Sequence, residues 1–346
     1  MRDGHRRRPV LRDELVTLAH GAGGKATRDL VEALFLEELG NEALAPLGDS
    51  AVVPPVGGRL AVTTDSYVVR PLTFPGGDIG ELAVNGTVND LAVAGARPLW
   101  LTAGFVLEEG LPVARLREIV RSAASAARRA GVPVAAGDTK VVERGKADGL
   151  YVTTAGVGVL EHDLDLVPAA VRPGDRVLLS GTLADHGMAV MIARGDLHLE
   201  GDVRSDTAPV HELAAALLGL GDALRWMRDP TRGGLATALN ELAGQAGLAV
   251  RLEERALPVE PAVAAACEIL GIDPLYVANE GKLVAVVAPE AAADALARLR
   301  AHPLGARAAE IGVVEAEPER MVLLDTALGG SRIVDLLVGD PLPRIC

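Results

Sequence analysis

Five aspartates stand close to glycine, threonine or asparagine in short motifs, where their carboxylates can be fixed and still reach a ligand. The motifs are "GDSAVV", "TTDSYVV", "NGTVNDLAVAG", "AAGDTK" and "DPTRGG", which carry Asp49, Asp65, Asp90, Asp138 and Asp229. Hard oxygen donors of this kind suit Mg²⁺ that holds a nucleoside triphosphate. Each aspartate also has another explanation: turns at strand ends for Asp49, Asp65 and Asp138, a helix cap for Asp229 and a solvated helix face for Asp90.

A glycine loop, "HGAGGK", lies near the start of the chain and ends in Gly23, Gly24 and Lys25. Glycines let backbone N–H groups approach an anion, and the lysine adds positive charge. The loop is not a Walker A motif, because Ala19 and Ala26 occupy positions where that motif needs glycine and serine or threonine. Phosphate binding and a plain turn into a helix both remain open for the loop alone.

The chain ends in "GDPLPRIC", so a cysteine, Cys346, is its last residue. Ten extended residues reach about 33 Å, enough to move a terminal thiol between a surface and a cleft. Pro341 and Pro343 stiffen this tail, and Arg344 gives it a charge. The alternative is a frayed end whose last residue is incidental. The other cysteine, Cys267, lies among alanines and is expected to be a small buried apolar residue.

The composition indicates an ordered globular chain. Of its 346 residues, 49% are hydrophobic, and a chain of this length usually forms two domains. The formal net charge of -13 argues against nucleic acid as a main partner. The basic start lacks the apolar core of a signal peptide, no later stretch is long enough to cross a membrane, and two cysteines indicate a reducing compartment. We therefore expect a cytoplasmic protein.

Alternating strand and helix patterns predict an α+β unit that ends near residue 160. The predicted helices begin near Ala26, at Asp78, which serves as N-cap with Glu81 completing a capping box, and at Val113. Strands are predicted over 99–107, 132–138 and 150–160.

The stretch 50–69 predicts a hairpin of two strands that turn at Gly57 and Gly58. In ideal register the hairpin would put Asp49 and Asp65 on opposite faces, and a bulge at its two prolines would align them.

A second unit is predicted after a polar, proline-bearing linker at 161–176. Its expected helices and strands alternate up to residue 326. The predicted domains are a disordered arm (1–14), an N-terminal ATP-binding and dimerisation domain (15–160), a C-terminal α/β domain (161–335) and a mobile tail (336–346).

The motifs named above, followed by "NEGK" at 279–282, resemble in this order the ATP-using superfamily of aminoimidazole ribonucleotide synthetase, selenophosphate synthetase and thiamine monophosphate kinase. With the ending "PRIC" the chain is most similar to the carbamoyl dehydratases of hydrogenase maturation. The resemblance covers nearly the whole chain except the arginine-rich start.

The resemblance implies an N-terminal domain that forms a shared barrel in a homodimer, with a C-terminal α/β domain beside it and a flexible tail. ATP and Mg²⁺ would lie in the cleft between the domains. It also implies two partners, a carbamoyltransferase that loads Cys346 and an iron-carrying scaffold that accepts cyanide.

Carried over by motif, the resemblance also implies roles for single residues. The metal and phosphate ligands would be Asp49, Asp65, Asp90, Asp138 and Asp229. The nucleotide would be bound by Gly23, Gly24, Lys25, Asn89, Gly137 and Thr139. The catalytic residues would be Cys346, Lys140, Glu280 and Arg232.

The implied reaction is the ATP-dependent dehydration of an S-carbamoyl group on Cys346 to a thiocyanate, which supplies the cyanide ligand for the iron of NiFe hydrogenase. Phosphorylation makes the amide oxygen a leaving group, Arg232 binds the transferring group, and Glu280 or Lys140 handles the proton. Two alternatives stay open: a sister enzyme acting on a free thiamine phosphate or selenide, and a non-catalytic carrier that uses Cys346. The glycine loop lacks the reactive cysteine or selenocysteine expected of a selenophosphate synthetase.

Overall fold

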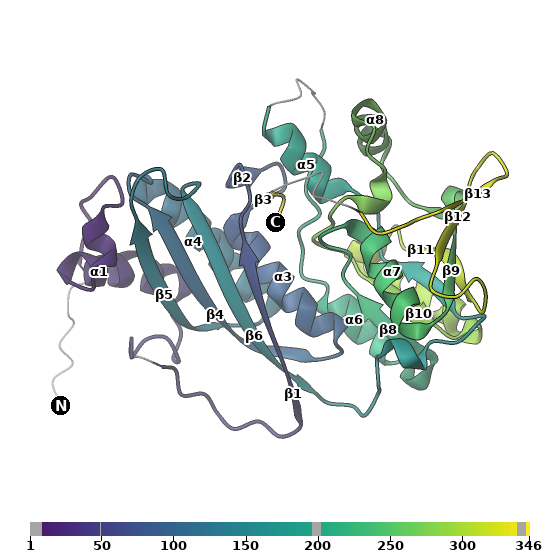
Figure 1. The fold of residues 1–346 in the computed structure, drawn as a ribbon. Helices are drawn as coiled ribbons and strands as arrows, with labels where there is room; N and C mark the ends of the chain where they lie inside the picture. Colours follow the sequence, from purple (N-terminus) through teal and green to yellow (C-terminus); the bar gives the residue numbers. More distant parts are fainter. Residues whose placement is uncertain (1–8, 49, 196–201, 338–343) are drawn as a thin grey trace.

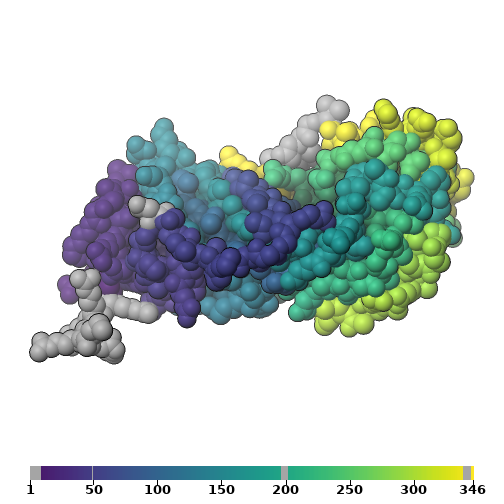
Figure 2. All heavy atoms as spheres, turned by 90° about the horizontal axis from the view of Figure 1, so that it is seen from below, coloured from purple at the N-terminus to yellow at the C-terminus, as the bar shows by residue number. Residues whose placement is uncertain are grey.

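The two halves of the chain form two sheets at opposite ends of an elongated molecule (Figure 1). The computed structural model describes residues 9–48, 50–195, 202–337 and 344–346. Figure 2 shows the two halves as lobes that lie side by side. The end of the chain lies between them, beside β3 and below α5 in the view of Figure 1.

The N-terminal sheet has four strands in the order β1-β6-β4-β5. These are β1 (Arg59–Tyr67), β4 (Arg97–Glu108), β5 (Val134–Val142) and β6 (Leu150–Leu160). β4 and β5 run parallel, whereas β6 pairs antiparallel with β1 and β4. Two helices, α3 (Ile79–Val93) and α4 (Val113–Ala130), pack against each other, and α3 lies against β1 and β6.

The local signals at the helix starts are largely confirmed. Asp78 caps α3 by accepting the N–H groups of Gly80 and Glu81. The Glu81 side chain pairs with Arg129 of α4 and so does not complete the predicted capping box. The predicted helix near Ala26 forms as α1 (Lys25–Leu30) and α2 (Leu36–Leu39), joined by a π-helical turn over Val31–Phe35.

The predicted hairpin is wrong. Residues 50–56 form no strand, and β1 pairs along its whole length with β6, from Arg59 opposite Leu160 to Tyr67 opposite Val152. Pro54 and Pro55 have no N–H group to donate to a ladder. β6, which contains no proline, therefore pairs with β1 in place of residues 50–56.

The C-terminal sheet has seven strands in the order β13-β12-β9-β11-β7-β10-β8. They are β7 (Arg176–Leu179), β8 (Leu224–Arg228), β9 (Ala249–Glu253), β10 (Val284–Val287), β11 (Ala309–Glu315), β12 (Val322–Asp325) and β13 (Ser331–Ile333). The helices are α5 (Asp185–Ala193), α6 (His211–Leu218), α7 (Gly234–Ala246), α8 (Pro261–Leu270) and α9 (Ala292–Arg300).

The predicted α/β domain needs one correction. Helices and strands do alternate, but among the described strands of the C-terminal sheet only β9 and β12 pair in parallel. The sheet is therefore mixed and mostly antiparallel, unlike the parallel sheet that the α/β class implies. A two-stranded piece, β2 (Thr73–Phe74) with β3 (Gly77–Asp78), precedes α3.

The two ends of the chain contact the folded body at their described residues. The carbonyl of Glu14, in the segment expected to be a disordered arm, accepts the N–H of Val113 at 2.9 Å. Residues 1–8 of that arm and 338–343 of the predicted tail lie outside the described residues. Across the part of the chain that the structure describes, no helix combines the length and apolar character needed to span a membrane.

Candidate active site

Six residues predicted from five separate motifs meet at one small cavity of about 30 Å³ between the two halves of the chain. They are Asp65, Asp90, Asp229, Arg232, Glu280 and Cys346. The sequence analysis missed four other lining residues, Ser66, Tyr67, Gly86 and Thr231. All four lie inside the quoted motifs, so position within a motif was the signal that could have found them.

Strand alternation brings the β1 part of the cavity against α3. Thr63, Asp65 and Tyr67 point to the covered face, and their neighbours in between are more exposed. The Tyr67 hydroxyl donates to Asp65 Oδ2 at 3.0 Å, and the Thr63 hydroxyl donates to Asp90 Oδ2 at 2.6 Å. A Cβ atom on Gly86 would lie 2.0 Å from the Tyr67 hydroxyl, so only glycine lets this ring reach Asp65.

The carboxylates of the cavity repel one another. Burial, with repulsion from Asp65, raises the pKa of Asp90 to about 6. Burial, with repulsion from Asp90, raises the pKa of Asp229 to about 7. Burial also raises the pKa of Glu280, with further contributions from Asp206 and Asp229. Such shifts are typical of sites where like charges are held together for function.

Asp229 reaches the cavity from the loop between β8 and α7. Its alternative role as a helix cap is wrong, because α7 starts at Gly234 and its N-cap is Gly233. Both glycines have positive φ, 73° and 63°, which bends the chain sharply between Asp229 and the helix.

The Cys346 thiol lies inside the cavity and shares its lining with the Glu280 carboxylate. Burial raises the pKa of this thiol, the Glu280 charge raises it further, and the Arg232 guanidinium opposes both. Ile345 is buried and 4% exposed, so the last residues are held in place and the frayed-end alternative does not apply to them.

A second group of predicted residues lies at the opposite edge of the N-terminal sheet. Its members are Gly23, Gly24, Lys25, Gly137, Asp138, Thr139 and Lys140. The glycine loop packs on β5, since a Cβ on Gly21 would meet Val141 N at 2.6 Å. Strands β6 and β4 separate β5 from β1, a spacing of about 14 Å. One chain therefore does not bring Asp138 or Lys140 to the carboxylates around Cys346.

Asn89 holds the two halves of the chain together. Its amide nitrogen donates to the carbonyls of Ala208 and Glu280, and its oxygen accepts the N–H of Val210. These bonds occupy the side chain that was predicted to bind nucleotide, and they fix the loop that carries Glu280. Asp49 lies outside the described residues.

Other side chains considered in the sequence have structural roles. Cys267 is buried, as expected, and burial raises its pKa to about 11. His20 accepts the N–H of Thr17 within its own turn. Among the described residues, no three or more histidine, cysteine or acidic side chains are arranged as a ready metal site.

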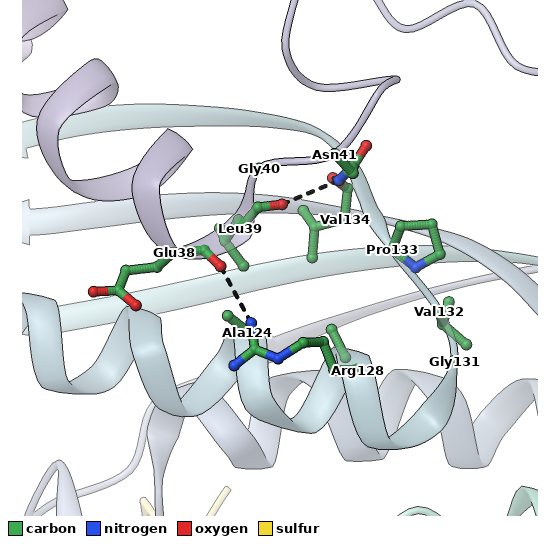
Figure 3. A pocket seen from close by; sticks show the side chains of 11 residues that line it. Glu38, Leu39, Gly40, Asn41, Ala124, Arg128, Gly131, Val132, Pro133 and Val134 are labelled. Carbon is green, nitrogen blue, oxygen red and sulfur yellow. Dashed lines mark hydrogen bonds between the residues drawn. The ribbon is translucent and has the colours of Figure 1, made fainter. Parts of the chain in front are cut away.

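Figure 3 shows a larger cavity, of about 230 Å³, between the end of α2 and the end of α4. Its polar groups bond to one another: the Asn41 amide donates to the carbonyls of Leu39 and Val134, and Arg128 donates to that of Glu38. Of the described residues that line it, none belongs to the predicted site. Volume therefore does not identify the reacting centre in this molecule.

Known proteins resemble the chain over its whole length. Residues 47–160 match the family model of AIR synthase related protein, N-terminal domain, and residues 172–324 match the model of the C-terminal domain. Carbamoyl dehydratase HypE of Bradyrhizobium diazoefficiens is 55% identical over 343 residues, which cover 99% of each chain. This chain belongs to the HypE family.

Solved structures of the HypE family agree with this assignment. A hydrogenase maturation protein HypE in complex with ATP is 45% identical, has a TM-score of 0.91 and covers 95% of this chain and 99% of its own. A HypE–HypF complex is 46% identical, has a TM-score of 0.78 and covers 89% of this chain and 99% of its own.

Proposed function

We propose that this chain is an ATP-dependent carbamoyl dehydratase that converts an S-carbamoyl group on its own Cys346 into a thiocyanate. The observation that carries the proposal is the position of the thiol, which lies in an acidic cavity beside Glu280 and Arg232 although it belongs to the last residue. The similar protein solved with ATP supports nucleotide use. The product would supply the cyanide ligand for the iron of NiFe hydrogenase.

The reaction transfers the carbamoyl oxygen to phosphorus. That oxygen attacks the γ-phosphorus of ATP, the bond to the bridging oxygen breaks, and ADP leaves. The C–O bond then breaks and phosphate departs while the nitrogen loses its two protons, so a C≡N bond forms. The sulfur–carbon bond stays intact and no atom changes oxidation state. The products are the S-cyano cysteine, ADP and phosphate.

Glu280 is the base that this geometry favours. It lines the same cavity as the Cys346 thiol, and its Oε1 is buried without a partner among the described residues. Burial raises its pKa, which makes the carboxylate a stronger base. Arg232 faces the same sulfur and would neutralise charge on the phosphoryl group in transit. Lys140, the other candidate base, lies on β5 outside this cavity.

The carboxylates of the cavity are the kind of oxygen donor that a magnesium ion takes, although among the described residues they are not arranged as a ready metal site. Asp65, Asp90 and Asp229 are oxygen donors of like charge in one cavity, and the raised pKa values of Asp90 and Asp229 reflect a cluster that a divalent cation would neutralise. When bound, the ion would stabilise charge on the transferring phosphoryl oxygens. Asp49 and Asp138 remain further candidate ligands.

A homodimer would explain why the predicted residues fall into two groups. Pairing of two N-terminal sheets can bring the glycine loop and β5 of one copy to the carboxylates of the other. The outer face of β1 supports such pairing, because Leu60 and Val62 are 56% and 74% exposed there. Lys140 and Asp138 of one chain would then act in the site of its partner.

The partners follow from the same chemistry. Cys346 needs a carbamoyltransferase that adds the carbamoyl group, and a similar protein has been solved in complex with HypF. An iron-carrying scaffold would then take cyanide from the sulfur. Transfer to either partner requires that the tail leave the cavity, since the thiol lies inside it.

Intact mass spectrometry tests the proposal on a defined substrate. Cyanate adds a carbamoyl group to a thiol without partner or nucleotide, and the treated, desalted protein is then incubated with Mg·ATP, with a non-hydrolysable analogue, or with ATP and EDTA. We expect an adduct of about 43 Da on the Cys346 peptide that loses about 18 Da only with Mg·ATP. Cys346→Ala is the control, and peptide mapping excludes Cys267.

Two outcomes would overturn the proposal. An adduct that persists on Cys346 with Mg·ATP, after loading by cyanate and by the carbamoyltransferase alike, would make the tail a carrier. ATP turnover that depends on an added thiamine phosphate or selenide, and not on Cys346, would identify a sister enzyme.

A further inference from the structure

The two residues before Cys346 have hydrogen-bond partners outside the cavity that holds its thiol. The Ile345 carbonyl accepts a hydrogen bond from His186 Nε2 at 2.9 Å. The Arg344 carbonyl accepts from the Arg70 N–H at 3.2 Å and from Arg194 Nη2 at 2.6 Å. The Arg344 guanidinium donates to Asp148 at 2.7 Å. These four partners, together with Ser205, are called the tail seat below.

His186 is the buried member of the tail seat. Its side chain is fully buried on α5, and the ring of Phe74 packs against it in a T-shaped arrangement at a centroid distance of 5.3 Å. The chemistry described above assigns this imidazole no role. A buried imidazole must satisfy both nitrogens, and here one of its two partners is the tail.

The neighbours of His186 determine which nitrogen carries its proton. Ser205 Oγ accepts the N–H of Thr207 at 3.1 Å and lies 2.8 Å from His186 Nδ1. The serine proton is then available to Nδ1, so Nδ1 accepts and Nε2 carries the hydrogen. Burial lowers the pKa of His186, in agreement with a neutral ring. The ring therefore presents an N–H donor toward Ile345.

Ser205 is itself held by the N-terminal half of the chain. Its N–H donates to the carbonyl of Pro75 at 2.7 Å. The next residue, Gly76, has φ +96°, and a Cβ on it would lie 2.6 Å from the Ser205 carbonyl oxygen. The donor on His186 is therefore oriented by both halves of the molecule and by groups that do not belong to the tail.

The docked tail has an unfavourable backbone conformation at Arg344, which these hydrogen bonds must stabilise. Arg344 has φ +57°, a left-handed conformation that is uncommon for residues other than glycine. Such a backbone persists only where its surroundings hold it. The bonds to the carbonyls of Arg344 and Ile345 provide that hold.

We propose that His186 is a positioning residue that holds the docked tail through the Ile345 carbonyl and thereby places the Cys346 sulfur beside Glu280. The bond is made to the backbone, one residue before the cysteine, so it does not depend on what the sulfur carries. The tail seat therefore binds the free, carbamoylated and cyanated tails alike. Its role in turnover rests on the proposed function, whereas its hold on the tail does not.

Alkylation of Cys346 by iodoacetamide, followed by peptide mass mapping, measures how often the unloaded tail leaves the cavity. His186→Phe keeps the aromatic packing and removes the donor, and we expect Cys346 to react about tenfold faster, the equivalent of one buried hydrogen bond. His186→Gln restores an N–H donor and should react within about threefold of wild type. The matched control is His162→Phe. This variant removes a histidine that lies away from the tail and bonds the Gly95 carbonyl at 2.9 Å.

The outcomes separate this inference from the proposed function. Wild-type alkylation rates in a folded His186→Phe protein would overturn it, as would equal acceleration by His162→Phe. If His186→Phe does not fold, Ser205→Ala tests the same inference. It removes the hydroxyl that donates to Nδ1 and so keeps the proton on Nε2, and its loss should also accelerate alkylation of Cys346. In carbamoyl-loaded protein, His186→Phe should slow dehydration without slowing loading. Absence of dehydration in wild type would reject the enzyme and leave the alkylation result standing.

Discussion

The thiol of Cys346 and the carboxylate of Glu280 line the same small cavity, although one ends the chain and the other precedes β10. The Glu280 charge raises the pKa of this thiol, and the Arg232 guanidinium lowers it. The protein thus places the last residue of this chain in one cavity with a carboxylate and a guanidinium. The predictions below follow from this pair and from the groups that surround it.

Glu280 and Arg232 should shift the acidity of the Cys346 thiol in opposite directions. Burial raises the pKa of the thiol, the Glu280 charge adds to that shift, and Arg232 opposes it. Glu280→Gln should therefore lower the thiol pKa and Arg232→Gln should raise it. The pH dependence of Cys346 alkylation measures both, and a shift of the same sign in the two variants would contradict the assigned contacts.

Gly86→Ala should disrupt the cavity from inside α3. The added methyl would lie 2.0 Å from the Tyr67 hydroxyl, so the ring must move and its bond to Asp65 is lost. We expect a loss of about 1–3 kcal/mol in the free energy of unfolding, as for other overpacked cores. The control is Gly244→Ala in α7, where no atom lies within 4 Å of the new methyl and helix propensity favours alanine. Equal denaturation midpoints in the two variants would refute the steric argument.

The carboxylate cluster should make the metal-free protein less stable as pH rises. The pKa values of Asp90 and Asp229 are raised to about 6 and about 7, so the folded chain binds more protons than the unfolded chain above their ordinary pKa of 3.8. Their stabilising contribution is complete below that pKa and is lost as pH rises through about 6 to 7.

Denaturation in EDTA across this range measures the loss, and Asp90→Asn should flatten the profile. Mg²⁺ should stabilise the protein more at pH 8 than at pH 5, because deprotonated carboxylates bind it. An unchanged profile in Asp90→Asn would separate the cluster from the pH dependence.

The buried His186 should make the protein less stable as the pH falls. Burial lowers the pKa of His186 from 6.5, while Asp206 and the Ile345 carbonyl oppose that shift. The folded chain therefore binds fewer protons than the unfolded chain, and the stability that the neutral ring contributes is complete above about pH 6.5 and is lost as the pH falls toward the lowered value. Urea denaturation of wild type and His186→Gln at each pH measures the effect. A difference in the free energy of unfolding that stays constant with pH would contradict this linkage.

The exposed face of β1 should carry the dimer contact. Val62 is 74% exposed there, and Val62→Lys places a charge on the surface that the proposed barrel would bury. We expect a shift from dimer to monomer in sedimentation velocity and a loss of ATP turnover together. Ile269→Lys is the control, since Ile269 on α8 is 68% exposed outside the N-terminal sheet. A Val62→Lys protein that stays dimeric would move the interface elsewhere.

Much of the local structure was predictable because its causes lie within a few residues. Asp78 caps α3 by accepting the N–H groups of Gly80 and Glu81, and periodic apolar residues place α4 where the sequence indicates it. The motifs also predicted six lining residues of the cavity before any fold was known.

Pairing and side-chain partners could not be predicted, because they depend on groups far apart in the chain. The sequence beside β1 indicated a hairpin, yet β6 provides its ladder from residues about ninety positions away. Asn89 looked like a nucleotide ligand in its motif, but folding brings Ala208 and Glu280 to its amide.

The sequence by itself determines which chemical groups are available to the candidate site, because a motif gives residue identity and order. These groups are carboxylates, a guanidinium and a terminal thiol. Their grouping is a property of the folded chain. Packing of the two halves of the chain against α3 brings Asp65, Asp229 and Cys346 into one cavity. Asp138 stays on β5, at the far edge of the N-terminal sheet. The seat of the tail has the same origin, since His186 meets Ile345 only after both halves have packed.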